Sequence, residues 1–180
     1  MKKVILFAAV STLILWSCTE DFDFDERGFE LTDLPGYVAF NPPGTSSSLA
    51  PFEAAEGDED PVEIEIEVPG GTLSDVTVNY SLGGTAVFGE DYTIDGATSS
   101  GGSIVIETTL VPNLDDEPLA TTMEVVILTD GVEDGEKTID ITLTGASNAE
   151  GDVAIGRGGT EALRTATVII ADAEAPEEDS

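Results

Sequence analysis

The seven residues Val62–Val68, VEIEIEV, alternate apolar side chains with glutamates. Successive side chains of a β-strand point to opposite faces, so one face of this stretch is apolar and the other carries carboxylates. Such a strand covers a hydrophobic core on one side and meets water on the other. The stretch therefore predicts a β-sheet with a single buried face.

The same two-residue period recurs at residues 76–82 and 139–143, which are expected to be strands. Residues 103–108, 122–128 and 166–171 alternate less clearly but are rich in β-branched residues, and they are expected to be strands as well, with 36–41 as the first. Gly-Gly, Asp-Gly and Pro-Gly dipeptides separate them, and no window carries a helical apolar stripe. About seven short strands predict an all-β fold, an antiparallel Greek-key β-sandwich of the immunoglobulin-like type. Residues 145–161 are polar and rich in glycine, and are expected to form a mobile loop.

The N-terminus has the composition of an export signal. Lys2 and Lys3 give a basic start, and residues 4–16 are almost entirely apolar. That apolar run is too short to span a bilayer comfortably. Residues 15–18, Leu-Trp-Ser-Cys, resemble the lipobox, in which the signal is cleaved before a cysteine that then carries lipid. The sequence thus predicts a lipoprotein signal peptide over residues 1–17 and a lipidated Cys18, which is a stable membrane anchor.

The remaining segments follow from charge. Residues 18–35 hold the lipidated cysteine and an acidic tether that cannot collapse on itself. Residues 19–26 resemble the acidic surface-export signal of lipoproteins from Bacteroidetes-type bacteria. That resemblance implies a cell-envelope location, in the outer membrane and displayed at the cell surface. Residues 36–174 are expected to be the β-sandwich domain, and 175–180 an acidic disordered tail.

The charge balance limits the classes of function. The chain has 37 acidic and 6 basic residues, a net charge of −31, which repels nucleic acid. It has no histidine, and its one cysteine is assigned to lipid. A Ser-His-Asp or Cys-His unit and a histidine-ligated zinc are therefore excluded. Paired carboxylates could serve glycoside hydrolysis, but nothing singles out one pair, so no enzymatic activity is predicted.

Three stretches together resemble a Calx-beta domain. Residues 78–92 are similar to that family's strand, its Gly-Thr-Ala turn and its Gly-x-Asp-Tyr segment. Residues 126–143 include the acidic turn at 130–136, and residues 166–174 look like the closing strand with its acidic end. Glu56-Gly57 matches an early Glu-Gly element. The resemblance covers residues 50–174, on a strand pattern that independently predicts a sandwich.

The resemblance implies a calcium site in the loops at one end of the sandwich. The ligands it implies are Glu56, Asp91, Asp130, Glu133, Glu136, Asp172 and Glu174. Calcium suits such loops, because it takes six to eight oxygen ligands in a flexible geometry. Thr129 stands where the family has a second acid, and Ala173 interrupts the closing acids. These losses imply weak binding, of roughly 10⁻⁴–10⁻³ M, or a lost site. Solvated acidic loops and turn-forming aspartates remain the alternative.

The sequence therefore predicts a lipid-anchored, calcium-binding module for adhesion or protein interaction. Its partners would be the membrane, through the anchor, and an unidentified protein or the matrix. The alternative is a non-metal-binding accessory or glycan-binding lipoprotein of an outer-membrane uptake complex. The only tryptophan, Trp16, lies in the signal, so an aromatic platform for sugars is not suggested.

Overall fold

The computed structural model describes residues 36–41, 46, 48–72, 74–108, 119–129, 132 and 135–172, all within the compact unit Asp33–Ser180. Over these residues the chain is almost entirely strand, which confirms the predicted all-β class. The elements are β1 (Tyr37–Phe40), β2 (Phe52–Ala55), β3 (Val62–Val68), β4 (Val76–Gly84), β5 (Tyr92–Ile94), β6 (Gly101–Ile106), β7 (Leu119–Ile127), β8 (Lys137–Asn148), β9 (Gly151–Ile155), the 3-10 turn η2 (Arg157–Gly159) and β10 (Thr165–Ala171). Among them, no helix has the length and apolar character needed to cross a membrane.

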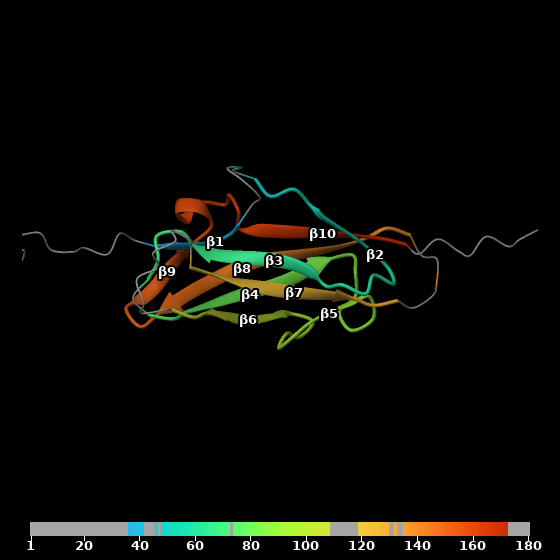
Figure 1. Cartoon of the computed structure of the whole chain (residues 1–180), viewed down its shortest axis with the longest axis horizontal. Helices are drawn as coiled ribbons and strands as arrows, with labels where there is room; N and C mark the ends of the chain where they lie inside the picture. The colour runs from blue at the N-terminus through green and yellow to red at the C-terminus, as the bar shows by residue number, and fades with distance from the viewer. Residues whose placement is uncertain are drawn as a thin grey trace, which may run out of the picture. The chain divides into compact units, whose positions relative to one another are not determined.

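The strands form two layers of a sandwich (Figure 1). One layer has the order β2-β10-β8-β4-β6, and the other has the order β1-β3-β7-β5. Strand β9 joins them, because its first half pairs with β8 at Val153 and its second half pairs with β1 at Ala154. The two layers are therefore connected by backbone hydrogen bonds through β9 and form one continuous sheet.

Most neighbouring strands are antiparallel, as predicted, but β1 with β9 and β2 with β10 are parallel pairs. The parallel register aligns Ala55 of β2 with Ala171 of β10. Both strands consequently end at the same level, and the residues that follow them emerge side by side. This arrangement creates the site described below.

The strand that decides the fold has the orientation its pattern predicts. Ile64, Ile66 and Val68 are buried, while Glu63 and Glu65 point to solvent. The buried side chains of both layers form one hydrophobic cluster. Burying a side chain of this size contributes about 1.5–3 kcal/mol, so this alternation is the main source of the fold's stability.

The prediction of a mobile loop over residues 145–161 was wrong. Strand β8 continues to Asn148, and β9 follows after a tight turn. The side-chain oxygen of Asn148 accepts the backbone N–H groups of Glu150 and Gly151, at 3.0 and 3.1 Å. Gly151 has a φ of 140°, which a side chain would disfavour. The polar and glycine-rich composition therefore marked a hairpin turn and not a long loop.

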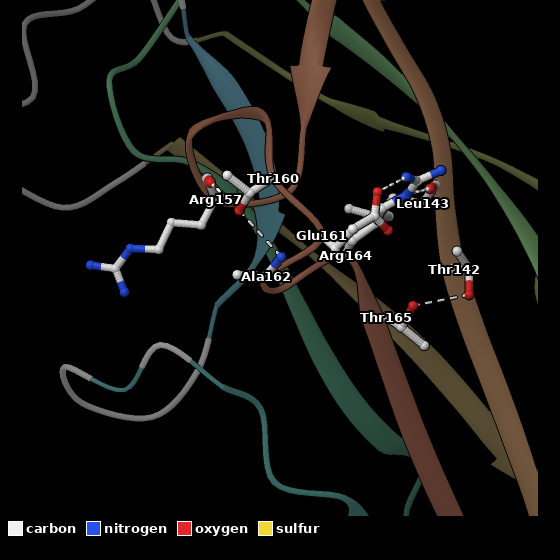
Figure 2. Close-up of polar contacts among 8 residues, drawn as sticks. All are labelled: Thr142, Leu143, Arg157, Thr160, Glu161, Ala162, Arg164 and Thr165. Atoms are coloured by element: carbon white, nitrogen blue, oxygen red, sulfur yellow. Dashed lines mark hydrogen bonds and ion pairs between the residues drawn. The ribbon is translucent and has the colours of Figure 1, made fainter.

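The connection from β9 to β10 ties the two layers together (Figure 2). The N–H of Phe40 in β1 donates to the carbonyl of Leu163, at 2.9 Å. The N–H of Leu143 in β8 donates to the carbonyl of Arg164 at 3.0 Å, and Arg164 returns a bond from Nε to the carbonyl of Leu143. One loop thus bonds to a strand of each layer and links the two layers.

Candidate functional site at one pole of the sandwich

Strand ends from both layers meet at one end of the sandwich. Strands β2 and β10 end there, and β8 begins there, with Lys137 opposite Ile170. In Figure 1 this is the end beyond the labels β2 and β5. We call it the carboxylate pole, and define it by the residues Glu56, Asp91, Gly135, Glu136, Lys137 and Asp172.

Asp91 is the one buried charged residue among the described residues, with 4% of its surface exposed. Its Oδ1 lies 2.6 Å from Nζ of Lys137, and its Oδ2 accepts the backbone N–H of Val87 at 2.5 Å. Both carboxylate oxygens therefore have a donor. The Asp91 carboxylate is neutralised by a cation that the chain itself supplies.

The turn before Asp91 places this carboxylate. The N–H of Asp91 donates to the carbonyl of Val87, and Gly89 within the turn has a φ of 85°. The carbonyl of Asp91 in turn accepts the N–H of Leu128 at 2.8 Å, which fastens the turn to the end of β7. Next to it, the rings of Phe88 and Tyr92 are perpendicular, with 5.6 Å between their centroids. Aspartate here acts as a turn former, as its residue type favours, and as an ion-pair partner.

The Gly84-Thr85-Ala86 turn holds the start of β8 beside Asp91. The N–H groups of Thr85 and Ala86 both donate to the carbonyl of Thr138, each at 2.9 Å, and the N–H of Thr138 donates to Oγ1 of Thr85. Thr138 is the neighbour of Lys137 in sequence. This clamp therefore sets the direction from which the lysine reaches Asp91.

The electrostatics of Asp91 follow from its contacts. Burial raises its pKa, because a charge is poorly solvated away from water. The hydrogen bond from Lys137, the hydrogen bond from Val87 and the positive charge of Lys137 together outweigh burial and leave the pKa below its ordinary value. Asp91 also contributes to raising the pKa of its neighbour Tyr92, after burial. The carboxylate is thus held in its charged form.

Asp172 presents a different environment at the same pole. Its Oδ2 accepts the N–H of Gly135 at 2.9 Å, which links the end of β10 to the segment before β8. Its Oδ1 is buried and has no hydrogen-bond partner among the residues that the structure describes. Glu56 lies beside it, since its N–H donates to the carbonyl of Ala171, and Oε2 of Glu56 is likewise shielded from solvent. Two buried carboxylate oxygens therefore belong to the residues that follow β2 and β10, where these paired strands end.

The structure brings together part of the predicted ligand set. Glu56, Asp91 and Asp172 all lie at the carboxylate pole, and Glu136 is exposed next to Lys137. Asp130, Glu133 and Glu174 lie outside the described residues, as do the predicted lipidation site Cys18, the tether 18–35 and the tail 175–180. Within the described ranges, no three acidic side chains are close enough to hold a metal ion by themselves.

Sequence reasoning missed Lys137. The signal for it was present, because Lys137 is the one lysine after residue 3 and it follows directly on the acidic turn. A lone cation among carboxylates is expected to find a carboxylate partner, and a partly buried one needs it.

Comparisons with known proteins identify the type of fold. No protein family and no curated protein matches the chain. Among solved structures, the chain resembles the apo form of the Calx CBD1 domain at 18% identity and a TM-score of 0.53, over 78% of this chain and 100% of that one. It resembles the Calx CBD2 domain at 17% identity and a TM-score of 0.52, over 77% and 87% of the two chains. The chain therefore has the fold of a Calx-beta sandwich, as the sequence resemblance implied, and identities this low establish the fold alone.

Of the carboxylates at the pole, Asp172 has an oxygen that a hard cation could contact, and Asp91 does not. A buried carboxylate oxygen without a donor is unfavourable, and a divalent cation would relieve this at Oδ1 of Asp172. Asp91 does not fit in this way, because Lys137 and Val87 already satisfy both of its oxygens. Among the described residues, Asp172 and Glu56 offer carboxylate oxygens to a cation but are too few to hold calcium by themselves, while Asp91 has a lysine in the role of the cation.

Proposed function

We propose that the protein is a lipid-anchored lipoprotein of the cell envelope whose Calx-beta-like sandwich is a calcium-responsive interaction module. The observation that carries the calcium assignment is the buried Oδ1 of Asp172, which has no hydrogen-bond donor among the described residues. Calcium, when bound, would supply positive charge to these carboxylates. The partner in this proposal is another protein or the surrounding matrix, and the location is the outer membrane with the domain displayed at the cell surface.

Asp172 is the residue through which a cation would act on the rest of the pole. Its Oδ2 already holds the N–H of Gly135, in the segment that leads from β7 to β8. Neutralising Asp172 and Glu56 would remove the repulsion between neighbouring carboxylates and so stabilise this segment. With few acidic ligands on the described residues, we expect weak binding, of roughly 10⁻⁴–10⁻³ M.

The place where the chain enters the sandwich supports an outward-facing role. A Cβ at Gly36 would lie 3.5 Å from the carbonyl oxygen of Gly71, in the turn between β3 and β4. Val68 at the end of β3, which precedes this turn, lies at the opposite end of its strand from Val62 and the carboxylate pole. The chain therefore enters the described part of the domain at the end opposite to the carboxylate pole, and the pole is not the end at which the preceding segment joins.

Thermal unfolding with calcium and with chelator tests the site. We expect calcium to raise the melting temperature of the wild type and Asp172→Asn to abolish that gain, because the variant removes the charge beside Glu56. Asp91→Asn is the matched control. It should lower the melting temperature in both buffers and keep the calcium gain, since Lys137 already occupies Asp91. Equal wild-type melting curves in the two buffers would refute calcium binding.

Lipid anchoring needs its own test. We expect Cys18→Ala to release the protein from membranes or to leave it unprocessed, as shown by fractionation and by the size of the product. Protease treatment of intact cells then reports surface display. Unchanged size and membrane attachment of Cys18→Ala would contradict the anchor, and full protection from protease would contradict display.

The Lys137–Asp91 pair favours one alternative. A pole neutralised by its own lysine can be stable without metal, so the module could be a non-metal-binding accessory subunit of an outer-membrane complex. The calcium melting experiment separates the two functions. A lack of any calcium effect, together with recovery of one dominant membrane complex by pull-down from native membranes, would favour the accessory role.

A further inference from the structure

Strand β6 is an open edge of the sandwich. Over the described residues it pairs with β4 and with no other strand. Its six residues read GGSIVI and carry no charge, in a chain with 37 acidic residues. Open edges are usually blunted by charge or by short length. The other two edges follow this rule, because β2 carries Glu53 and β5 has only three residues.

A groove runs beside this edge. Strand β5 pairs with β7 only at Val125–Ile127, so the rest of β7 has no neighbour on that side among the described strands. Between β6 and β7 lies a cavity of about 410 Å³. Ile94, Ile104 and Met123 line its floor, and its rim carries the carboxylates Asp95 and Glu124.

The exposed surface of the edge is apolar. Val105 of β6 is 45% exposed, and Ile104 is only partly buried although it packs against the core. An apolar floor with an acidic rim, next to backbone groups that have no partner among the described strands, has the features of a site for strand addition. The main chain of a bound strand supplies affinity there, and alternate side chains enter the groove.

We propose that β6 and its groove bind an extended peptide segment of a partner protein, with apolar and basic side chains in alternation. The peptide backbone pairs with β6, its apolar side chains enter the groove at Ile104 and Met123, and its basic side chains point away from the groove and are attracted by the negative charge of the chain. A second copy of this chain is a poor occupant, because two chains that each have a net charge of −31 repel one another. This inference deepens the interaction role proposed above but is independent of the calcium site.

The test measures binding of a defined peptide in the presence of chelator, so that failure of the calcium site does not affect it. The probe is a fluorescein-labelled octapeptide of alternating lysine and valine with blocked ends, titrated with the purified protein by fluorescence anisotropy. Its control is the same sequence with alternate backbone amides N-methylated. Strand pairing predicts at least about tenfold weaker binding of the methylated peptide, because its backbone donors are lost. Equal binding of both peptides would overturn the proposal.

Two matched variants locate the site on the protein. Val105→Lys adds a positive charge at the edge, and Val126→Lys adds the same charge at a residue of nearly equal exposure, 44%, where β7 already pairs with Thr93 of β5. We expect Val105→Lys to weaken binding by about tenfold or more, and Val126→Lys by less than about threefold, since only the first obstructs strand addition. Equal losses would show general charge attraction and overturn the proposal.

Two further measurements complete the test. If Val105→Lys does not fold, as judged by its melting curve, Ser103→Lys is used in its place, because it puts the charge on the same exposed face of β6. Sedimentation of the wild type reports self-association. A dimer that the β6 variant dissociates would make a second copy the occupant, and would overturn assignment of the edge to a partner peptide.

Discussion

The ammonium nitrogen of Lys137 lies 2.6 Å from Oδ1 of Asp91, and only 15% and 4% of the two side chains are exposed. The pair joins the first residue of β8 to the turn before β5, which lie 46 positions apart in the chain. Buried ion pairs add little stability compared with apolar residues, but removing one partner leaves an uncompensated charge. The buried charge of Asp91 at the carboxylate pole is therefore compensated by Lys137, a cation of the same chain.

Replacing Lys137 by methionine keeps the length of the side chain and removes its charge. Because Asp91 would remain buried without its cation, we expect the free energy of unfolding to fall by about 3–5 kcal/mol. The double variant with Asp91→Leu should recover much of this loss. Urea unfolding of the wild type, both single variants and the double variant measures the coupling. Glu136→Gln, an exposed change next to Lys137, is the control, and a loss below about 1 kcal/mol for Lys137→Met would contradict the role of the pair.

The lowered pKa of Asp91 predicts how stability changes with pH. The folded state binds a proton at Asp91 more weakly than the unfolded state, in which the carboxyl group has its ordinary pKa of 3.8. The stabilisation by Asp91 is therefore complete above that value and is lost as the pH falls through the folded pKa. We expect the difference in unfolding free energy between wild type and Asp91→Asn to be constant from about pH 7 to 5 and to shrink below about pH 4. A difference that stays constant down to about pH 2.5 would contradict this.

The sequence was most informative where a strand is long and has one buried face. Strand β3 and the core-facing residues of β4 and β8 follow directly from their two-residue periods. Asp91, which the resemblance grouped with Glu56 and Asp172, lies with them at the carboxylate pole. In these cases the information is local, since one strand's pattern determines which of its faces is buried.

The remaining features depend on contacts that are distant in sequence. Strands β2 and β5 have four and three residues, too few to show a period, and they exist because β10 and β7 pair with them. The parallel register that sets Glu56 beside Asp172 joins residues more than a hundred positions apart. The partner of Lys137 could not be chosen from 37 acidic residues without the fold. Tertiary pairing therefore determined what the local pattern left open.

Two glutamates of the outer face lie directly opposite each other across strands β3 and β7. Glu63 pairs in register with Glu124, and both are exposed. Like charges in this position are destabilising, and opposite charges contribute roughly 0.2–1 kcal/mol. We expect Glu63→Lys to raise the free energy of unfolding by about 1 kcal/mol at low salt, with the gain reduced at high salt. Glu59→Lys changes the net charge equally outside the strands, and an equal gain for that control would assign the effect to net charge alone.

Gly84 makes the clamp between the Gly-Thr-Ala turn and β8 possible. Its φ is 101°, and a Cβ at this position would lie 2.2 Å from the carbonyl oxygen of Thr138, which accepts two hydrogen bonds from the turn. The oxygen cannot move away without breaking those bonds, so we expect Gly84→Ala to lower the free energy of unfolding by more than about 2 kcal/mol. Gly70→Ala, where a Cβ meets nothing within 4 Å, is the control and should change it by less than about 1 kcal/mol. Equal losses for Gly84→Ala and Gly70→Ala in urea unfolding would mean that the close approach of Gly84 to Thr138 does not contribute to stability.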